Sequence, residues 1–291
     1  MFKRVLVFTT LMFVLCGLSG NLSAKNSKEE EVLRFGISAT VSPKDTVNTY
    51  QEMIYYVGEK LGISVEIVQR KTYEEMDKLL EKGNVKAAFI CGGSYVVDHD
   101  AFGAELLAAP QAYGGNVYCS YIIVSKDSPI EKFEDLRGKR FAFTDPNGTT
   151  GYISPVYMLS KMNESPESFF SEHIFSGHHG NSIKLVAGRE IDGASVENLV
   201  WEYLNAYEPA LTSKTKIILK SDSYGIAPIV VSPSIDIGLK MRIRDIFLNM
   251  HKDEYGKKIL EKVFIDKFVV PDDKDYDGIR EMKKWINKKE K

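Results

Sequence analysis

Apolar runs of strand length alternate with amphipathic segments along most of the chain, beginning near residue 32. In the first part of the chain, the spacing of apolar and polar positions predicts strands and helices in turn. Strands that alternate with helices favour a parallel sheet with helical crossovers. The predicted strands are residues 33–39, 65–69, 86–90 and 105–109, and the predicted helices between them are residues 48–61, 73–81 and 94–102.

The pattern changes at residues 113–116 (YGGN), and residues 117–125 then form one long β-rich run. A second alternating set follows, with strands at 140–143, 173–175 and 191–195 and helices at 150–162, 181–187 and 197–207. Two more β-rich segments, 216–219 and 228–231, precede a tail that we expect to be helical at 237–250, 255–263 and 275–288.

Two α/β sets connected by two β-rich crossings predict an α/β fold with two Rossmann-like lobes. We expect one lobe to comprise residues 32–116 together with 227–291, and the other to comprise residues 117–226. In open α/β sheets, the carboxyl ends of strands and the N-termini of helices converge at a crevice that binds ligands. The sequence therefore predicts a ligand cleft between the lobes.

The N-terminus has the composition of a secretory signal peptide. Its first four residues include the basic Lys3 and Arg4, an apolar run continues to Leu18, and small residues follow up to Ala24. The apolar run is short for a membrane span. We therefore expect residues 1–24 to be a signal peptide that directs the protein to the periplasm. A lipoprotein anchored at Cys16 is the less favoured alternative, because Leu15 precedes this cysteine where a small residue is usual.

Removal of the signal peptide takes away two basic and no acidic residues, so the formal net charge changes from −2 to −4. This composition does not suggest nucleic acid or an anionic membrane surface as a partner. Neutral donors and helix ends would have to hold an anionic ligand. Cys91 and Cys119 remain, and they form either a disulfide or two buried thiols. No residues stand at zinc-ligand spacing, and we expect neither a metal nor a cofactor.

The most informative segment is residues 141–155 (FAFTDPNGTTGYISP), where a strand runs into a polar turn and the next helix opens near Thr149 and Thr150. Free backbone N–H groups at a helix start, together with the helix dipole, make a neutral seat for an anion. The two hydroxyls add donors that can rotate toward the oxygens of an oxyanion. The alternative is that one of the threonines caps the helix, and caps are far commoner than ligand sites.

Other candidates lie where predicted strands meet helices or cross between the lobes. Tyr73 opens a helix at a strand–helix junction, where it either contributes to a site or acts as an aromatic staple. Tyr118 and Tyr121 lie in the crossing strand at an odd spacing, so they point to opposite sheet faces and at most one faces the cleft. Ser94 opens a helix after two glycines, which permit close backbone approach or only a tight turn.

His178 and His179 precede a helix, where a histidine can donate to an anion or cap the helix in solvent. The sequence has no G-x-S-x-G, no G-x-x-x-x-G-K-[ST] and no H-E-x-x-H motif. We therefore expect no catalytic residues.

Taken together, these segments resemble the phosphate/phosphite/phosphonate-binding periplasmic proteins of ABC importers, over about residues 33–284. The most specific element is residues 145–151 (DPNGTTG), which is close to the D-P-N-S-T-S-G of that family. Several supporting segments follow the same order: LRFGIS (33–38), YCSYIIV (118–124), KDSPI (126–130), EDLRGKR (134–140), FSGHHGNSIK (175–184) and APIVVSP (227–233).

The resemblance implies a type II periplasmic-binding fold and a set of residues around an oxyanion. His179 is preferred to His178 because the His-x-Asn-Ser pattern of the family fits residues 179–182. The implied ligand-binding residues are Tyr73, Tyr118, Thr149, Thr150 and His179, with Ser94 and Gly148 beside them.

This chain departs from the family pattern at informative positions. Gly148 stands where serine is usual, which removes one hydroxyl, and Cys91 stands where glycine is usual. Ala227 stands where aminophosphonate binders carry an aspartate that pairs with the ammonium group. The resemblance therefore implies a preference for phosphate, phosphite or simple alkylphosphonates, although Glu197 falls near another acidic position of such binders.

The function that the resemblance implies is capture. We expect a monomer that closes around a small phosphorus oxyanion and hands it to an ABC permease in the inner membrane. The same capture would also suit a sensor that reports to a membrane signalling partner. A third hypothesis is a secreted phosphate-ester hydrolase that uses His179 as an acid or base. The sequence does not choose among phosphate, phosphite and phosphonates.

Overall fold

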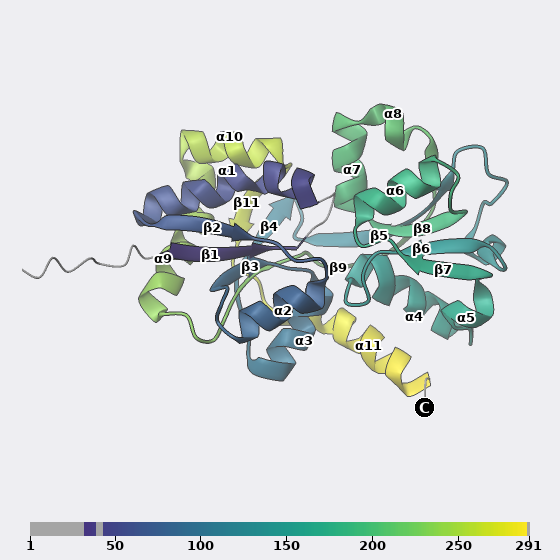
Figure 1. Ribbon diagram of the computed structural model, residues 1–291, viewed down its shortest axis with the longest axis horizontal. Helices are drawn as coiled ribbons and strands as arrows, with labels where there is room; N and C mark the ends of the chain where they lie inside the picture. The colour runs from purple at the N-terminus through teal and green to yellow at the C-terminus, as the bar shows by residue number, and fades with distance from the viewer. Residues whose placement is uncertain (1–31, 39–42, 290–291) are drawn as a thin grey trace, which may run out of the picture. The chain divides into compact units, whose positions relative to one another are not determined.

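The computed structural model describes residues 32–38 and 43–289, so the predicted signal peptide lies outside the described residues. The described part of the chain forms two β-sheets, each with helices on both faces (Figure 1). None of the helices in this part is both long enough and apolar enough to span a membrane.

The first sheet has six strands in the order β11-β4-β10-β3-β1-β2. β1, β2 and β3 pair in parallel, whereas β10 pairs antiparallel with both β3 and β4, and β11 pairs antiparallel with β4. The bounds of these strands are β1 (Val32–Ile37), β2 (Ser64–Val68), β3 (Ala87–Phe89), β4 (Glu105–Ala112), β10 (Ile229–Val231) and β11 (Ile265–Val269).

Helices cover both faces of this sheet because its inner strands are apolar on both sides. Leu33, Phe35 and Ile37 of β1 are buried against one group of helices: α1 (Pro43–Leu61), α9 (Ile237–Asn249) and α10 (Glu254–Lys262). Ala88 and Val230 are buried on the other face, against α2 (Tyr73–Glu81), α3 (Gly92–Phe102) and α11 (Asp277–Lys289). Burying each large apolar side chain contributes about 1.5–3 kcal/mol.

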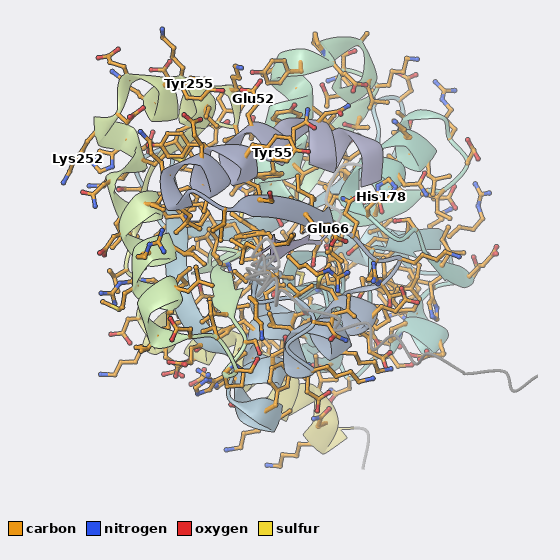
Figure 2. All side chains as sticks on the ribbon, turned by 60° about the vertical axis from the view of Figure 1, so that its left-hand side comes forward. Glu52, Tyr55, Glu66, His178, Lys252 and Tyr255 are labelled. Carbon is orange, nitrogen blue, oxygen red and sulfur yellow. The ribbon has the colours of Figure 1, made fainter. Side chains whose placement is uncertain are left out.

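Two tyrosines mark the outer surface of this region. Tyr55 of α1 and Tyr255 of α10 are labelled on the outside of the helices in Figure 2, and more than half of each residue is exposed.

The second sheet has five strands in the order β7-β6-β8-β5-β9. β6 pairs in parallel with β7 and β8, and β5 pairs antiparallel with β8 and β9. The strands are β5 (Val117–Ser125), β6 (Arg140–Phe143), β7 (Glu172–Phe175), β8 (Gly193–Glu197) and β9 (Thr215–Gly225). The helices on one face are α6 (His179–Ala187) and α7 (Asn198–Tyr207), and those on the other are α4 (Ser154–Lys161) and α5 (Pro166–Phe169).

Short elements complete the described chain. They are the 3₁₀ turns η1 (Phe133–Leu136), η3 (Met250–Lys252) and η4 (Asp273–Tyr276), the π-helical turn η2 (Thr149–Ile153), and the single-turn helix α8 (Pro209–Thr212).

The prediction of a purely helical tail was wrong at β11. This strand follows Phe264, which has a positive φ of 56°, and pairs with β4 from the first part of the chain. Its burial does not alternate, so it lacks the period-two pattern that identifies a half-buried strand. β8 also ends later than predicted, which makes Glu197 the last residue of a strand rather than the first of a helix.

We refer to the six-stranded sheet with its helices as the first lobe and to the five-stranded sheet with its helices as the second lobe. The strands of each sheet come from the part of the chain that the sequence predicts for that lobe. The exact residue bounds of the lobes remain a prediction. The two lobes are packed together. Trp285 of α11 lies with its ring centroid 6.2 Å from that of Tyr157 of α4, and Ile153 of η2 is buried among core residues of the first lobe.

Candidate functional site

The predicted anion seat begins where β6 ends in the second lobe. The chain turns through residues 144–148, enters η2 and continues into α4. Asp145 holds this turn, since its Oδ1 accepts a hydrogen bond from the Asn147 N–H (2.9 Å). Its Oδ2 accepts one from the N–H of Tyr73 (3.2 Å), the first residue of α2. Asp145 therefore connects the turn to the first lobe.

Two glycines allow backbone segments to approach each other here. A Cβ on Gly151 would lie 1.8 Å from Thr144 Oγ1, so the turn closes only with glycine at this position. A Cβ on Gly93 would lie 2.2 Å from the carbonyl oxygen of Asn147. Since Gly93 belongs to α3 and Asn147 to the second lobe, this second glycine sets how closely the lobes meet.

Thr149 is the first residue of η2 and is completely buried. Its N–H donates to Cys91 Sγ (3.2 Å), and its Oγ1 lies 3.4 Å from the same sulfur. The Tyr118 hydroxyl lies 3.5 Å from that sulfur. Cys91 belongs to the first lobe, whereas Thr149 and Tyr118 belong to the second. Three groups that the sequence predicts as anion donors thus meet at one buried point.

Thr150 and Gly148 lie beside this point in the chain. Thr150 is 1% exposed, and its hydroxyl has no hydrogen-bond partner among the described residues. Gly148 is the N-cap residue of η2, which therefore has no side-chain cap. A Cβ at this position would lie 3.8 Å from the Tyr73 ring. The hydrogen bonds of this segment give neither threonine a capping role. A buried hydroxyl without a partner is unusual in a protein interior.

Tyr73 and Tyr118 are both almost completely buried. Burial raises the pKa of each phenol well above its ordinary value, so both remain protonated donors at physiological pH. Tyr121 points elsewhere, because its hydroxyl donates to Glu202 (3.0 Å) and its ring packs in a different core cluster. This agrees with the opposite faces predicted from their spacing.

The two histidines have separate roles. His178 caps α6, since its Nδ1 accepts a hydrogen bond from the Asn181 N–H (3.1 Å). His179 is 2% exposed, and its Nδ1 accepts from the Glu197 N–H (3.0 Å). Burial lowers the pKa of His179 to about 3, so the ring is neutral and its one proton is on Nε2. His179 can therefore donate one hydrogen bond from Nε2.

Ser94 is buried in α3, but its hydroxyl donates to Asp77 Oδ2 (3.2 Å). Asp77 also interacts with Asp98, and burial raises the pKa of Asp77 to about 7 and that of Asp98 to about 9. This pair of carboxyl groups therefore keeps a proton at neutral pH. The structure thus joins Ser94 to the acidic pair rather than to the point where Thr149 and Tyr118 meet.

Glu197 and Lys283 were not among the predicted site residues. Glu197 is 8% exposed, and its Oε2 lies 3.8 Å from His179 Nε2. Burial raises the pKa of Glu197 to about 7. Burial also lowers the pKa of Lys283 on α11, and ionisation of Cys91 or Asp77 would act in the opposite direction. Lys283 lies in the helical tail, where the sequence gives no signal that it approaches the site.

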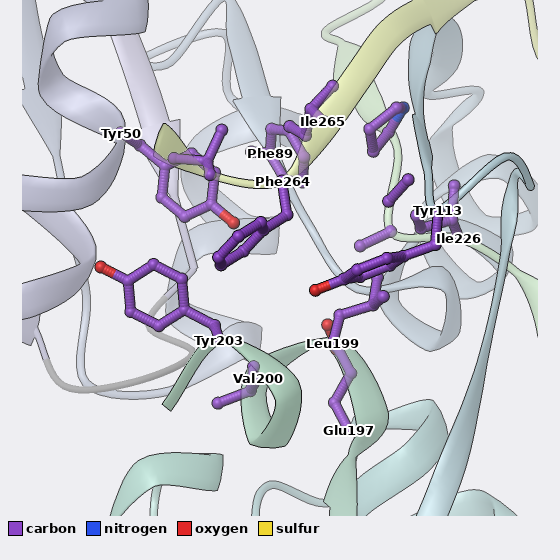
Figure 3. Close-up of a pocket in the computed structure, with 14 residues that line it drawn as sticks. Tyr50, Phe89, Tyr113, Glu197, Leu199, Val200, Tyr203, Ile226, Phe264 and Ile265 are labelled. Carbon is purple, nitrogen blue, oxygen red and sulfur yellow. The ribbon is translucent and has the colours of Figure 1, made fainter. Parts of the chain in front are cut away.

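A cavity of about 60 Å³ adjoins Glu197 and receives side chains from both lobes (Figure 3). Figure 3 shows Tyr50 and Tyr203 on one side of this space, Tyr113 and Glu197 on the other, and Phe264 between them. Ala227 also lines it. We call this cavity the aromatic chamber and define it by Tyr50, Phe89, Tyr113, Tyr203, Phe264 and Glu197.

The aromatic chamber adjoins the predicted anion seat through shared residues. Glu197 lies in the chamber and contacts His179. Ala112 and Ile226 line the chamber and pack in one cluster with Tyr118. The predicted anion seat, which is polar, and the aromatic chamber therefore lie next to each other.

The family model that describes the periplasmic phosphonate substrate-binding protein of ABC transporters matches residues 35–276. The chain belongs to this family. It is 30% identical over 266 residues to the phosphonates-binding periplasmic protein of Escherichia coli K12, across 89% of this chain and 77% of that protein. The resemblance predicted from the sequence motifs is confirmed.

Solved structures of two relatives have the same fold. A binding-protein component of an ABC phosphonate transporter from Pseudomonas aeruginosa has a TM-score of 0.85 at 24% identity, over 90% of this chain and 88% of that one. PhnD1 of Prochlorococcus marinus (MIT 9301), in complex with methylphosphonate, has a TM-score of 0.81 at 20% identity, over 89% and 99% of the two chains. The predicted two-lobed α/β fold is confirmed, and the protein is a substrate-binding member of this ABC-transporter family.

Proposed function

We propose that this protein captures a phosphorus oxyanion between its lobes at Thr149, Thr150, Tyr118, Tyr73 and His179. The main support is that the Thr149 N–H, the Thr149 hydroxyl and the Tyr118 hydroxyl all lie within hydrogen-bond distance of one buried atom, the sulfur of Cys91, where the lobes meet. The unpartnered Thr150 hydroxyl adds a fourth donor. Tetrahedral oxyanions present several acceptor oxygens to such a set, and the start of a helix favours negative charge.

The donors are neutral, which suits selective capture and release. A phosphonate, phosphite or phosphate would exchange its hydration for hydrogen bonds from protonated hydroxyls and the His179 Nε2–H. The partly buried Lys283 adds positive potential near Cys91. Among these ligands, the family membership and the methylphosphonate complex of the Prochlorococcus relative favour a phosphonate.

We infer that capture occurs without catalysis. The hydrolase hypothesis gives the role of acid or base to His179, and for that role its pKa would need to lie near neutral pH. Because burial holds the pKa of His179 at about 3, this imidazole is a weak base at neutral pH. Ligand that contacts both lobes would instead stabilise their closed arrangement, which an ABC permease can recognise. In this proposal the protein acts as a monomer, is exported by residues 1–24 and works in the periplasm.

The test is calorimetry and thermal unfolding of the exported protein in phosphate-free buffer. The ligands are phosphate, phosphite and methylphosphonate, with sulfate as a tetrahedral control. A ligand at 100 times its Kd adds about 2.7 kcal/mol to the free energy of unfolding, so a bound oxyanion should raise the melting temperature clearly. If none of the three phosphorus compounds changes melting at millimolar concentration, or if sulfate binds as tightly as they do, the proposal is wrong.

A further inference from the structure

The aromatic chamber brings rings from five separate segments to one space in the cleft. Tyr50 lies on α1 and Phe89 at the end of β3, with ring centroids 5.4 Å apart. Phe264 lies 6.2 Å from Tyr203 of α7 and 6.0 Å from Tyr113, again between ring centroids. Both lobes thus contribute aromatic side chains to this space. Glu197, which also lines it, lies 3.8 Å from His179 of the predicted anion seat.

Two of these aromatic residues have an unfavourable backbone conformation. Tyr113 has φ = 52° and Phe264 has φ = 56°, in the left-handed region where a Cβ is crowded and glycine is favoured. Their rings are nevertheless stacked on each other at an interplanar angle of 20°. A large ring at such a position costs free energy that glycine would avoid. The strain therefore indicates that the side chains themselves are needed at the chamber.

Glu197 gives the chamber a single acidic group. The residue is 8% exposed, and no lysine or arginine among the described residues forms an ion pair with it. Its one nearby base, His179, is neutral and uses Nδ1 to accept from the Glu197 backbone. A buried carboxylate is costly without a positive partner. A cationic ligand group would supply that partner.

On the basis of the proposed function, we infer that the chamber holds a methylated ammonium group carried by the same ligand whose phosphonate occupies the seat. Aromatic faces attract cations, and aromatic cages recognise quaternary ammonium groups in particular. A primary ammonium is strongly hydrated and gains less from rings, because it needs hydrogen-bond acceptors in place of water. A cavity of about 60 Å³ has room for about four to six water molecules, which suits a 2-(trimethylammonio)ethyl group better than a methyl group.

This inference changes an expectation drawn from the sequence. The expected preference against cationic substituents rested on the missing acid at Ala227. In the structure Ala227 and Glu197 line the same chamber, so an acidic group is present there although position 227 lacks one.

The experiment compares four phosphonates by calorimetry: methylphosphonate, 2-aminoethylphosphonate, 2-(trimethylammonio)ethylphosphonate and its uncharged isostere 3,3-dimethylbutylphosphonate. The last two share shape and differ in charge. We expect the trimethylammonio compound to bind at least tenfold more tightly than the isostere and more tightly than the aminoethyl compound. The inference is overturned if the two isosteres bind equally tightly, or if the aminoethyl compound binds more tightly than the trimethylammonio compound. Binding of methylphosphonate in the same experiment would still support the proposed oxyanion site. Failure of all four to bind, together with failure of phosphate and phosphite, would reject the proposed function itself.

Variants then assign the effect to the chamber through the ratio of the affinities of the two isosteres. Glu197→Gln and Tyr203→Leu should each reduce this ratio several-fold. Tyr255→Leu is the matched control, because Tyr255 is an exposed tyrosine of the same lobe as Phe264 but lies outside the chamber. A ratio that is unchanged in both chamber variants, or reduced equally in the control, contradicts the assignment.

Discussion

Replacing Gly93 by alanine should block closure of the lobes without harming the fold. The new Cβ would lie 2.2 Å from the Asn147 carbonyl oxygen and 2.8 Å from Ile153 Cδ1. Ordinary van der Waals contact begins near 3.4 Å, so the segments must separate by about 1 Å. No side-chain rotation relieves this contact, because the Asn147 oxygen belongs to the backbone. Overpacking of this kind costs about 1–3 kcal/mol, which corresponds to a loss of about five- to a hundredfold in affinity.

Calorimetry with methylphosphonate measures this loss, and small-angle scattering with saturating ligand shows whether the lobes still close. Gly93 lies in the first turn of α3, where alanine favours the helix, so the melting temperature without ligand should not fall. Gly278→Ala is the control, because a Cβ there meets nothing within 4 Å. If Gly93→Ala binds within threefold of the unaltered protein, binding does not require this close approach and the reasoning fails.

Three further outcomes follow from the site. Thr149→Val should weaken oxyanion binding about ten- to a hundredfold, because it removes a donor to a charged group but keeps the shape; calorimetry that gives an unchanged affinity would show that the hydroxyl does not contact the ligand. Glu197 has a pKa of about 7 in the folded protein and an ordinary value of 4.5, so the folded state holds the extra proton and stability falls as the pH rises between these values. Glu197→Gln should therefore be more stable than the unaltered protein at pH 8 by up to about 3 kcal/mol and equally stable at pH 4; a difference that does not vary with pH in denaturant titrations would contradict this. Cys91 and Cys119 are free, so thiol titration of denatured, unreduced protein that lacks residues 1–24 should find both reactive, and a quantitative disulfide would refute it.

Local patterns in the sequence predicted most of the fold. The bounds of α2, β5 and β6 agree with the prediction because each has a clear start and stop, such as Thr72 as the N-cap of α2 and Gly83 just beyond its end. β11 was missed because its partner strand is about 150 residues earlier in the chain, and pairing over that distance leaves no local pattern.

The candidate site was predictable only in part. The start of η2 and its two threonines stand out locally, and the family resemblance selected Tyr73, Tyr118 and His179 from the other local candidates; their contact with a ligand stays a prediction. The sulfur contact of Cys91 and the position of Glu197 depend on the packing of one lobe against the other. The aromatic chamber combines residues from positions 50 to 264, so no segment of the sequence contains it.

The central place of β10 has a consequence for how the protein is made. This strand lies between β3 and β4 in the first sheet, yet the chain reaches it only after the whole of the second sheet. A chain that emerges N-terminus first can complete the five-stranded sheet as soon as residue 225 is free. Until residue 231 follows, β3 and β4 each have an unpaired edge, and such edges attract other strands. The sheet whose strands begin the chain is therefore the last to be completed, because β10 and β11 both follow the second sheet.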